Sequence, residues 1–156
     1  MSLENVKNYF KQFNLDIKIQ ELPQSSATVK LAAAAIGCEP QRIAKSLAFA
    51  GENNPILIVT SGDTKIDNAK FKAEFKIKAK MLTPEQTSLL IGHTIGGVCP
   101  FATNKNVAVY LDISLKRFNS IFPACGSSNS VIELSVEELE KHSNYTKWID
   151  VCKPIN

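Results

Sequence analysis

The sequence contains no hydrophobic run long enough to cross a bilayer. Its longest apolar stretch, Leu31–Ile36, is about a third of the ~20 residues that a membrane-spanning helix needs. The first residues, Met1–Asn5, also lack the basic segment and apolar core of a secretory signal. These absences predict a soluble, cytoplasmic protein with no membrane partner.

Cysteine and histidine are too scarce and too scattered to predict a metal site or a disulfide framework. The chain has four cysteines and two histidines, and no two cysteines form a Cys-x-x-Cys pair. Widely spaced cysteines are typical of reduced thiols in a cytosolic protein, so we expect no metal site and no disulfide. The sequence also shows no Ser-His-Asp pattern, and we expect no cofactor.

Net charge is small as well, and at +3 it is too low to establish a nucleic-acid partner by itself. The distribution of charge is more informative. Between Asp63 and Lys80, three acidic residues are outnumbered by six lysines, namely Lys65, Lys70, Lys72, Lys76, Lys78 and Lys80. Such a run fits a basic surface that binds nucleic acid or an ordinary solvated helix face, and the residues alone leave both interpretations open.

With 156 residues, of which 44% are hydrophobic, the chain has the size and composition of one globular domain. Its seven glycines and seven prolines form no repeat and no low-complexity segment. No internal boundary is visible. We therefore expect a single domain over 1–156.

Hydrophobic spacing and capping residues predict helices and strands in mixed order. Thr28 is the expected N-cap of a helix that ends at Gly37, and Asp67 begins a helix to about residue 75. Thr83 and Ser135 each begin a capping box, followed by helices to about residues 91 and 142. The remaining elements are a helix over 6–12 and strands over 17–20, 47–50, 56–60, 79–82, 107–111, 120–122 and 131–134. This order predicts an α+β fold with a mixed sheet and peripheral helices.

The segment Ile95–Phe101 is the clearest candidate for a substrate-binding loop. Gly96 and Gly97 allow the backbone to approach a ligand closely or to adopt a positive φ, and Pro100 restricts the chain that follows. The backbone N–H groups of such a loop can stabilise a developing oxyanion. A Gly-Gly turn before a proline is also an ordinary strand connector, so the spacing alone does not decide between the two.

Lys45 stands where a helical turn after Glu39-Pro40 runs into an apolar strand. A lysine at the start of a strand is usually a solvated end residue. Here, however, Lys45, the Gly96 loop and the small-residue segment Ala124–Ser130 occur together in one order along the chain.

These features together resemble the YbaK family, also called the prolyl-tRNA synthetase associated or editing domain family, whose members remove wrongly attached amino acids from tRNA. The resemblance extends from about Val6 to Leu139 and implies a twisted, partly barrel-like mixed sheet with a pocket at one side. It rests on Lys45 in an apolar strand, a strand and Gly-Asp before Asp67, the Gly-x-x-x-Pro loop Gly96–Pro100, and Val109–Asp112 leading to Gly126.

The resemblance ties activity to Lys45 and Gly96, and we add Gly97 as a second donor of a backbone N–H. The predicted substrate-binding residues are Thr28, Ser46, Cys99, Pro100, Cys125, Gly126 and Ser127, and the predicted tRNA-binding residues are Lys65, Lys70 and Lys72. Cys99 stands where serine is common in the family. Thr28 and Val131 stand where some bacterial members carry phenylalanine and an acidic residue, which leaves the amino-acid specificity open.

The implied function is that of a metal-independent trans-editing deacylase. Its substrate would be tRNA-Pro, or a similar tRNA, mischarged with cysteine, alanine, serine or threonine, and an aminoacyl-tRNA synthetase is a second potential partner. Lys45 would position the substrate, while an ordered water or a group on the substrate attacks the ester. Alternatives are a noncatalytic module that binds tRNA or a synthetase, and a small-molecule hydrolase. Lys45 as a base, or Cys99 or Cys125 as a nucleophile beside His93, are the other chemical options.

Overall fold

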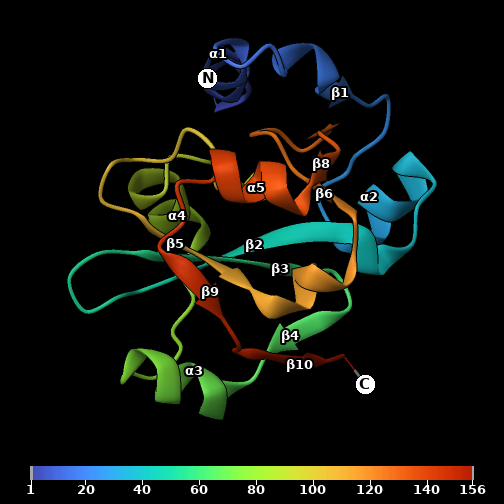
Figure 1. The fold of residues 1–156 in the computed structure, drawn as a ribbon. Coiled ribbons are helices and arrows are strands. Elements are labelled where there is room, and N and C mark those ends of the chain that lie inside the picture. Colours follow the sequence, from blue (N-terminus) through green and yellow to red (C-terminus); the bar gives the residue numbers. More distant parts are fainter. Residues whose placement is uncertain (1, 156) are drawn as a thin grey trace.

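The centre of the fold is a six-stranded mixed sheet with strand order β8-β6-β2-β3-β5-β9 (Figure 1). The computed structural model describes residues 2–155. The antiparallel pair β2 (Ile43–Phe49) and β3 (Ile56–Ser61) forms the middle of the sheet. Beyond β3 lie the parallel strands β5 (Ala108–Asp112) and β9 (Lys147–Ile149), and beyond β2 lie parallel β6 (Ser120–Pro123) and then β8 (Leu134–Ser135), antiparallel to β6. The predicted α+β class and the curled, half-barrel mixed sheet are confirmed.

Two small antiparallel sheets and several helices surround the central sheet. One small sheet joins β1 (Gln20–Glu21) to β7 (Ser130–Val131), and the other joins β4 (Thr64–Ile66) to β10 (Cys152–Pro154). The helices are α1 (Ser2–Lys11), α2 (Val29–Ile36), α3 (Asn68–Phe75), α4 (Pro84–Leu90) and α5 (Val136–His142), with short 3-10 turns at 16–18, 40–42 and 113–117. No helix within residues 2–155 combines the length and the apolar character that crossing a membrane requires.

Four of the five predicted helix starts are confirmed because each depends on a side chain that caps its own first turn, whereas α1 begins at Ser2, four residues before its predicted start. Thr28 accepts a hydrogen bond from the Leu31 N–H at 3.2 Å, and Asp67 accepts from two N–H groups of α3. Thr83 and Ser135 both form complete capping boxes. Gly37 ends α2 with a φ of +82°, as the sequence predicted.

Several strand predictions were wrong. Residues 17–20 form a 3-10 turn followed by the start of β1, and Ile17 is 85% exposed, so its alternation with polar neighbours did not reflect burial. The segment 79–82 contributes only an isolated bridge between Phe49 and Met81, and 131–134 is divided between β7 and β8. The strands β4, β9 and β10 were not predicted, and each is only three residues long.

β2 also begins at Ile43, four residues before its predicted start. Lys45 therefore lies inside a strand that is paired with β3 through Thr60, and not at the head of the strand. Successive side chains of a strand point to opposite faces, so Lys45 and its neighbour Ser46 project in different directions. This alternation decides which of the two side chains faces which part of the site.

Candidate functional site

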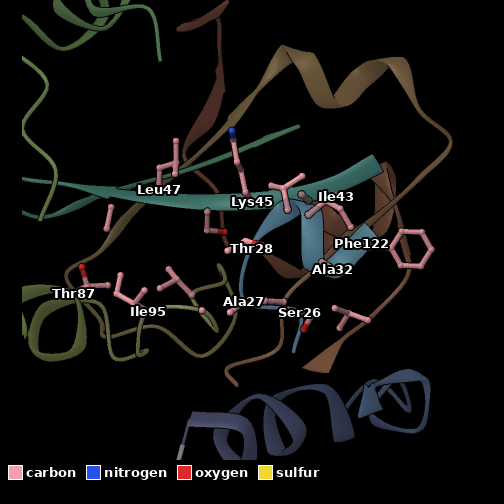
Figure 2. A pocket seen from close by; sticks show the side chains of 18 of the residues that line it. Ser26, Ala27, Thr28, Ala32, Ile43, Lys45, Leu47, Thr87, Ile95 and Phe122 are labelled. Carbon is pink, nitrogen blue, oxygen red and sulfur yellow. The ribbon is translucent and has the colours of Figure 1, made fainter. Parts of the chain in front are cut away.

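A pocket of about 290 Å³ lies where one edge of β2 loses its strand partner (Figure 2). β6 pairs with β2 only at Ile43 and Ala44, and pairing on that edge resumes at Ala48, whose carbonyl accepts from the Leu82 N–H at 3.0 Å. Between Ala44 and Ala48 this edge of β2 has no strand partner in the part of the chain that the structure describes, and a cavity lies there in place of a neighbouring strand. Its lining consists of Ser26, Ala27, Thr28, Val29, Ala32, Ile43, Ala44, Lys45, Ser46, Leu47, Ala48, Met81, Leu82, Thr87, Ile95, Gly96, Val98, Phe122, Ala124 and Val131.

The walls of this pocket are mainly apolar, and four side-chain hydroxyls interrupt them. Ser26 donates to the Ser128 carbonyl at 3.3 Å, Thr87 donates to the Thr83 carbonyl at 2.8 Å, and Thr28 caps α2. The Oγ atom of Ser46 is buried and has no hydrogen-bond partner within residues 2–155. Ser46 is therefore the one lining residue whose hydroxyl has no partner in the described part of the chain, although its Oγ is not reached from the open space of the cavity.

Lys45 contributes its side chain to the lining, but its ammonium group lies to one side of the cavity. The ammonium donates a hydrogen bond to the Thr64 carbonyl of β4. Figure 2 shows the side chain pointing away from Ala27, Thr28 and Ile95. Burial lowers the pKa of Lys45, and the nearby Asp63 carboxylate offsets part of this effect. The geometry thus places a partly desolvated cation beside the pocket, at its β4 side.

The loop that carries Gly96 covers the pocket opposite the β2 floor. Gly96 has a φ of +95°, a conformation that an L-residue adopts only with strain. A Cβ added there would lie 3.1 Å from the Ala27 Cβ and 3.4 Å from the Ser128 Cβ. The Gly96 N–H has no hydrogen-bond partner within residues 2–155. The loop therefore brings an unused backbone donor to the wall of the pocket.

The structure gives Gly97, Gly126 and Ser127 a different position from the one expected. The Gly97 N–H already donates to the Thr94 carbonyl at 3.0 Å, and the Gly97 carbonyl accepts from the Gly126 N–H at 2.9 Å. A Cβ on Gly97 would lie 2.4 Å from the Gly126 carbonyl carbon, while the Ser127 Oγ lies 2.6 Å from the Ser130 Oγ. These residues join two loops behind the pocket and do not line it, and Gly97 offers no free donor.

Cys99 and Pro100, which belong to the same loop, are buried, as is Cys125, and none of the three lines the pocket. The Cys99 Sγ lies 3.5 Å from the Nε2 of His93, a contact that nothing in their spacing indicated. Burial raises the pKa of Cys99 to about 12 and raises that of Cys125 as well. Burial also lowers the pKa of His93. Both thiols thus stay protonated in the core, which disfavours a thiolate nucleophile.

Comparison with known proteins identifies the family to which this pocket and its Gly96 loop belong. The sequence pattern of the aminoacyl-tRNA editing domain matches residues 24–142, a segment that includes Lys45, Gly96 and every other residue that lines the pocket. The chain belongs to the aminoacyl-tRNA editing domain family. The resemblance based on the lysine and on the Gly-x-x-x-Pro loop is therefore confirmed.

Relatives of this editing domain include free-standing chains and parts of synthetases. The chain is 53% identical to the uncharacterized protein YwhH of Bacillus subtilis (strain 168), over 98% of both chains. It is 34% identical over 85 residues to the proline–tRNA ligase of Thermotoga neapolitana, a match that spans 53% of this chain and 15% of the ligase. A crystal structure described as a proposed trans-editing enzyme for prolyl tRNA synthetase superposes with a TM-score of 0.87, at 30% identity and 97% coverage of both chains.

The three lysines predicted to bind tRNA are all exposed on or near β4 and α3 of the editing domain. Lys65 is next to Thr64, the residue whose carbonyl holds Lys45, and neither Lys65 nor Lys72 forms an ion pair within residues 2–155. Lys70 forms an ion pair with Asp150 at 3.0 Å, and this contact raises its pKa. Two of the three cations are thus free to meet phosphate.

Of the predicted site residues, Thr28, Lys45, Ser46 and Gly96 line the pocket of the editing domain. Most of the remaining lining was missed, because it consists of ordinary apolar side chains that the fold collects from separate segments. The Thr87 hydroxyl was also missed, since a threonine inside a helix gives no sequence signal. Within residues 2–155, no three His, Cys, Asp or Glu side chains gather closely enough to hold a metal ion.

Proposed function

We propose that this editing domain is a trans-acting aminoacyl-tRNA deacylase that hydrolyses the ester of a tRNA mischarged with a small amino acid. The observation that carries the proposal is the pocket itself. It unites a floor of small side chains on β2, a glycine with a free N–H at positive φ, and a lysine in one cavity of about 290 Å³. The prolyl-tRNA synthetase relatives make tRNA-Pro the first candidate tRNA.

In the proposed mechanism the aminoacyl group enters the pocket and its ester carbonyl faces the Gly96 loop. Ester hydrolysis passes through a tetrahedral oxyanion, which the free N–H of Gly96 would stabilise. The ammonium of Lys45 would bind the ribose or phosphate end of the tRNA, because it lies to one side of the cavity. An ordered water, activated directly or through a group on the substrate, would then attack the carbonyl of an ester that is already in position, and the bond to the ribose oxygen would break to release the free amino acid and the ribose hydroxyl.

A separate hydrolytic site is useful because a synthetase pocket discriminates poorly among small side chains. A missing methylene changes synthetase selectivity by only about 10- to 200-fold, so wrongly charged products accumulate unless they are hydrolysed. The structure described as a proposed trans-editing enzyme, which matches this chain over 97% of both lengths, supports the assignment of such a role here.

A deacylation screen tests the proposal. Purified protein is mixed with tRNA-Pro charged in turn with alanine, cysteine, serine and threonine, and release of the amino acid is measured against buffer alone. Correctly charged Pro-tRNA-Pro and a different tRNA carrying the same amino acid are the controls. Release from at least one mischarged tRNA supports the proposal. Binding without release would favour the noncatalytic module, and equal turnover of a free aminoacyl ester would favour a small-molecule hydrolase.

We expect tRNA to bind through the lysines of β4 and α3. The tRNA affinity of a variant with Lys65, Lys70 and Lys72 all changed to alanine should therefore depend less steeply on salt concentration. Each lost phosphate contact should flatten the slope of log affinity against log salt by about 0.7 to 0.9. The measurement is the affinity for uncharged tRNA over a series of salt concentrations.

A matched triple variant removes the same charge elsewhere, through Lys11→Ala, Lys18→Ala and Lys141→Ala. These residues are exposed, and Figure 1 shows α1 on the other side of the central sheet from α3 and β4. The matched variant should keep nearly the slope of the unchanged protein. Equal flattening in both variants, or in neither, would mean that tRNA binds to another surface.

A further inference from the structure

Ser46 carries the only pocket hydroxyl that lacks a partner within residues 2–155. Its Oγ is buried from solvent, whereas the hydroxyls of Ser26, Thr28 and Thr87 are all engaged by the protein. A buried hydroxyl without a hydrogen bond is unfavourable. When rotation of the Ser46 side chain about χ1 exposes the Oγ to the cavity, a molecule there that supplies the missing partner is bound better than one of the same size that does not.

The surroundings of Ser46 limit the kind of partner that fits. Strand alternation places its side chain on the same face of β2 as Ala44 and Ala48. Ala44 packs in the core cluster that contains Cys99, and Ala48 packs with Leu82 and Val98. Burying a charged group against this apolar floor costs much more free energy than burying a neutral hydroxyl that forms a hydrogen bond. The α-amino group of a substrate is thus a poor partner for Ser46.

Building on the proposed function, on which this inference rests, we propose that Ser46 selects the amino acid. Its Oγ exchanges a hydrogen bond with the side-chain hydroxyl of serine or threonine esterified to tRNA. An alanyl group offers no partner and leaves the Oγ of Ser46 unpaired, and a cysteine thiol is only a weak donor and acceptor. A site that is built to pair with a hydroxyl discriminates against the analogue that lacks it. The pocket therefore favours seryl or threonyl esters over alanyl esters.

The test compares kcat/KM of the unchanged protein and of Ser46→Ala on Ser-, Thr- and Ala-tRNA-Pro. The unchanged protein should hydrolyse the better hydroxyl substrate at least about tenfold faster than Ala-tRNA-Pro, which is the effect of about one net hydrogen bond. Ser46→Ala should abolish this preference, by slowing the hydroxyl substrates while the alanyl rate stays the same or rises. The Tm of Ser46→Ala should not fall, because the hydroxyl makes no hydrogen bond within the described residues 2–155.

Ser143→Ala is the matched control. The Ser143 Oγ is also buried without a partner within residues 2–155, but it lies at the end of α5 and not in the pocket. This variant should keep both the rates and the preference. If the unchanged protein prefers the alanyl ester, or if Ser46→Ala slows all three substrates equally with a lower Tm, the inference is overturned and the deacylase function stands. If no amino acid is released from any of these tRNAs, both fail.

Discussion

Gly96→Ala should lower the single-turnover rate of deacylation on the order of 100- to 1000-fold, the usual cost of losing one oxyanion donor. Two effects combine. At a φ of +95° an alanine is strained, so the loop backbone shifts. The added Cβ would also lie 3.1 Å from the Ala27 Cβ and press the loop against the segment before α2. Either shift displaces the free Gly96 N–H from the ester carbonyl that it is proposed to bind.

Gly37→Ala separates the effect of strain from the effect on the site. Gly37 also has a positive φ, of +82°, but a Cβ there meets nothing within 4 Å and the residue does not line the pocket. Both variants should lose roughly 1–2 kcal/mol of unfolding free energy to the backbone, measured by denaturant titration. Only Gly96→Ala should lose turnover. Equal rates in the two variants would remove the Gly96 N–H from the mechanism.

Cys99→Ser is the complementary variant on the same loop. Since the Cys99 thiol is buried and burial raises its pKa to about 12, we expect the serine variant to keep most of the activity. If Cys99→Ser abolishes turnover while Gly96→Ala leaves it intact, a thiol-nucleophile mechanism replaces the one proposed here. A covalent acyl-enzyme should then be detectable by mass spectrometry.

Lys45→Ala should reduce deacylation at least about tenfold while the protein still folds cooperatively. The ammonium makes one hydrogen bond to the Thr64 carbonyl, and its desolvation offsets part of that gain, so the cost to folding is small. Its cost to function is larger, because a positioned charge beside the pocket orients the ribose or phosphate of the tRNA. The measurements are kcat/KM for the mischarged tRNA and a thermal melt.

Two further variants show whether an effect of Lys45→Ala comes from the loss of its charge at this position. Lys45→Met keeps an unbranched stem against the pocket wall but removes the charge, so it should be as slow as Lys45→Ala. Lys141→Ala removes an exposed charge on α5 and should be unaffected. An active Lys45→Met variant would show that the stem, and not the ammonium, matters. A Lys45→Ala protein that no longer melts cooperatively would make the residue structural.

Helix boundaries were predictable from the sequence because their causes are local. Thr28, Asp67, Thr83 and Ser135 each cap N–H groups two or three residues further on, and Gly37 supplies the positive φ that ends α2. The strands were less predictable. In the part of the chain that the structure describes, β4 and β10 pair only with each other and lie far apart in the sequence, so neither has a local signal that reveals it. A strand this short exists because of its partner.

The site, like the fold, was predictable from the sequence only in part. The four motifs that include Lys45 and the Gly-x-x-x-Pro loop were together enough to identify the family. Of the residues predicted for the site, Thr28, Ser46 and Gly96 line one pocket together with Lys45. The tertiary structure decided which neighbours face the cavity. Strand alternation separates Lys45 from Ser46, the Thr94 carbonyl occupies the Gly97 N–H, and core packing encloses Cys99. Sequence spacing specifies residue type and order, whereas exposure and hydrogen-bond partners depend on segments that meet only when the chain folds.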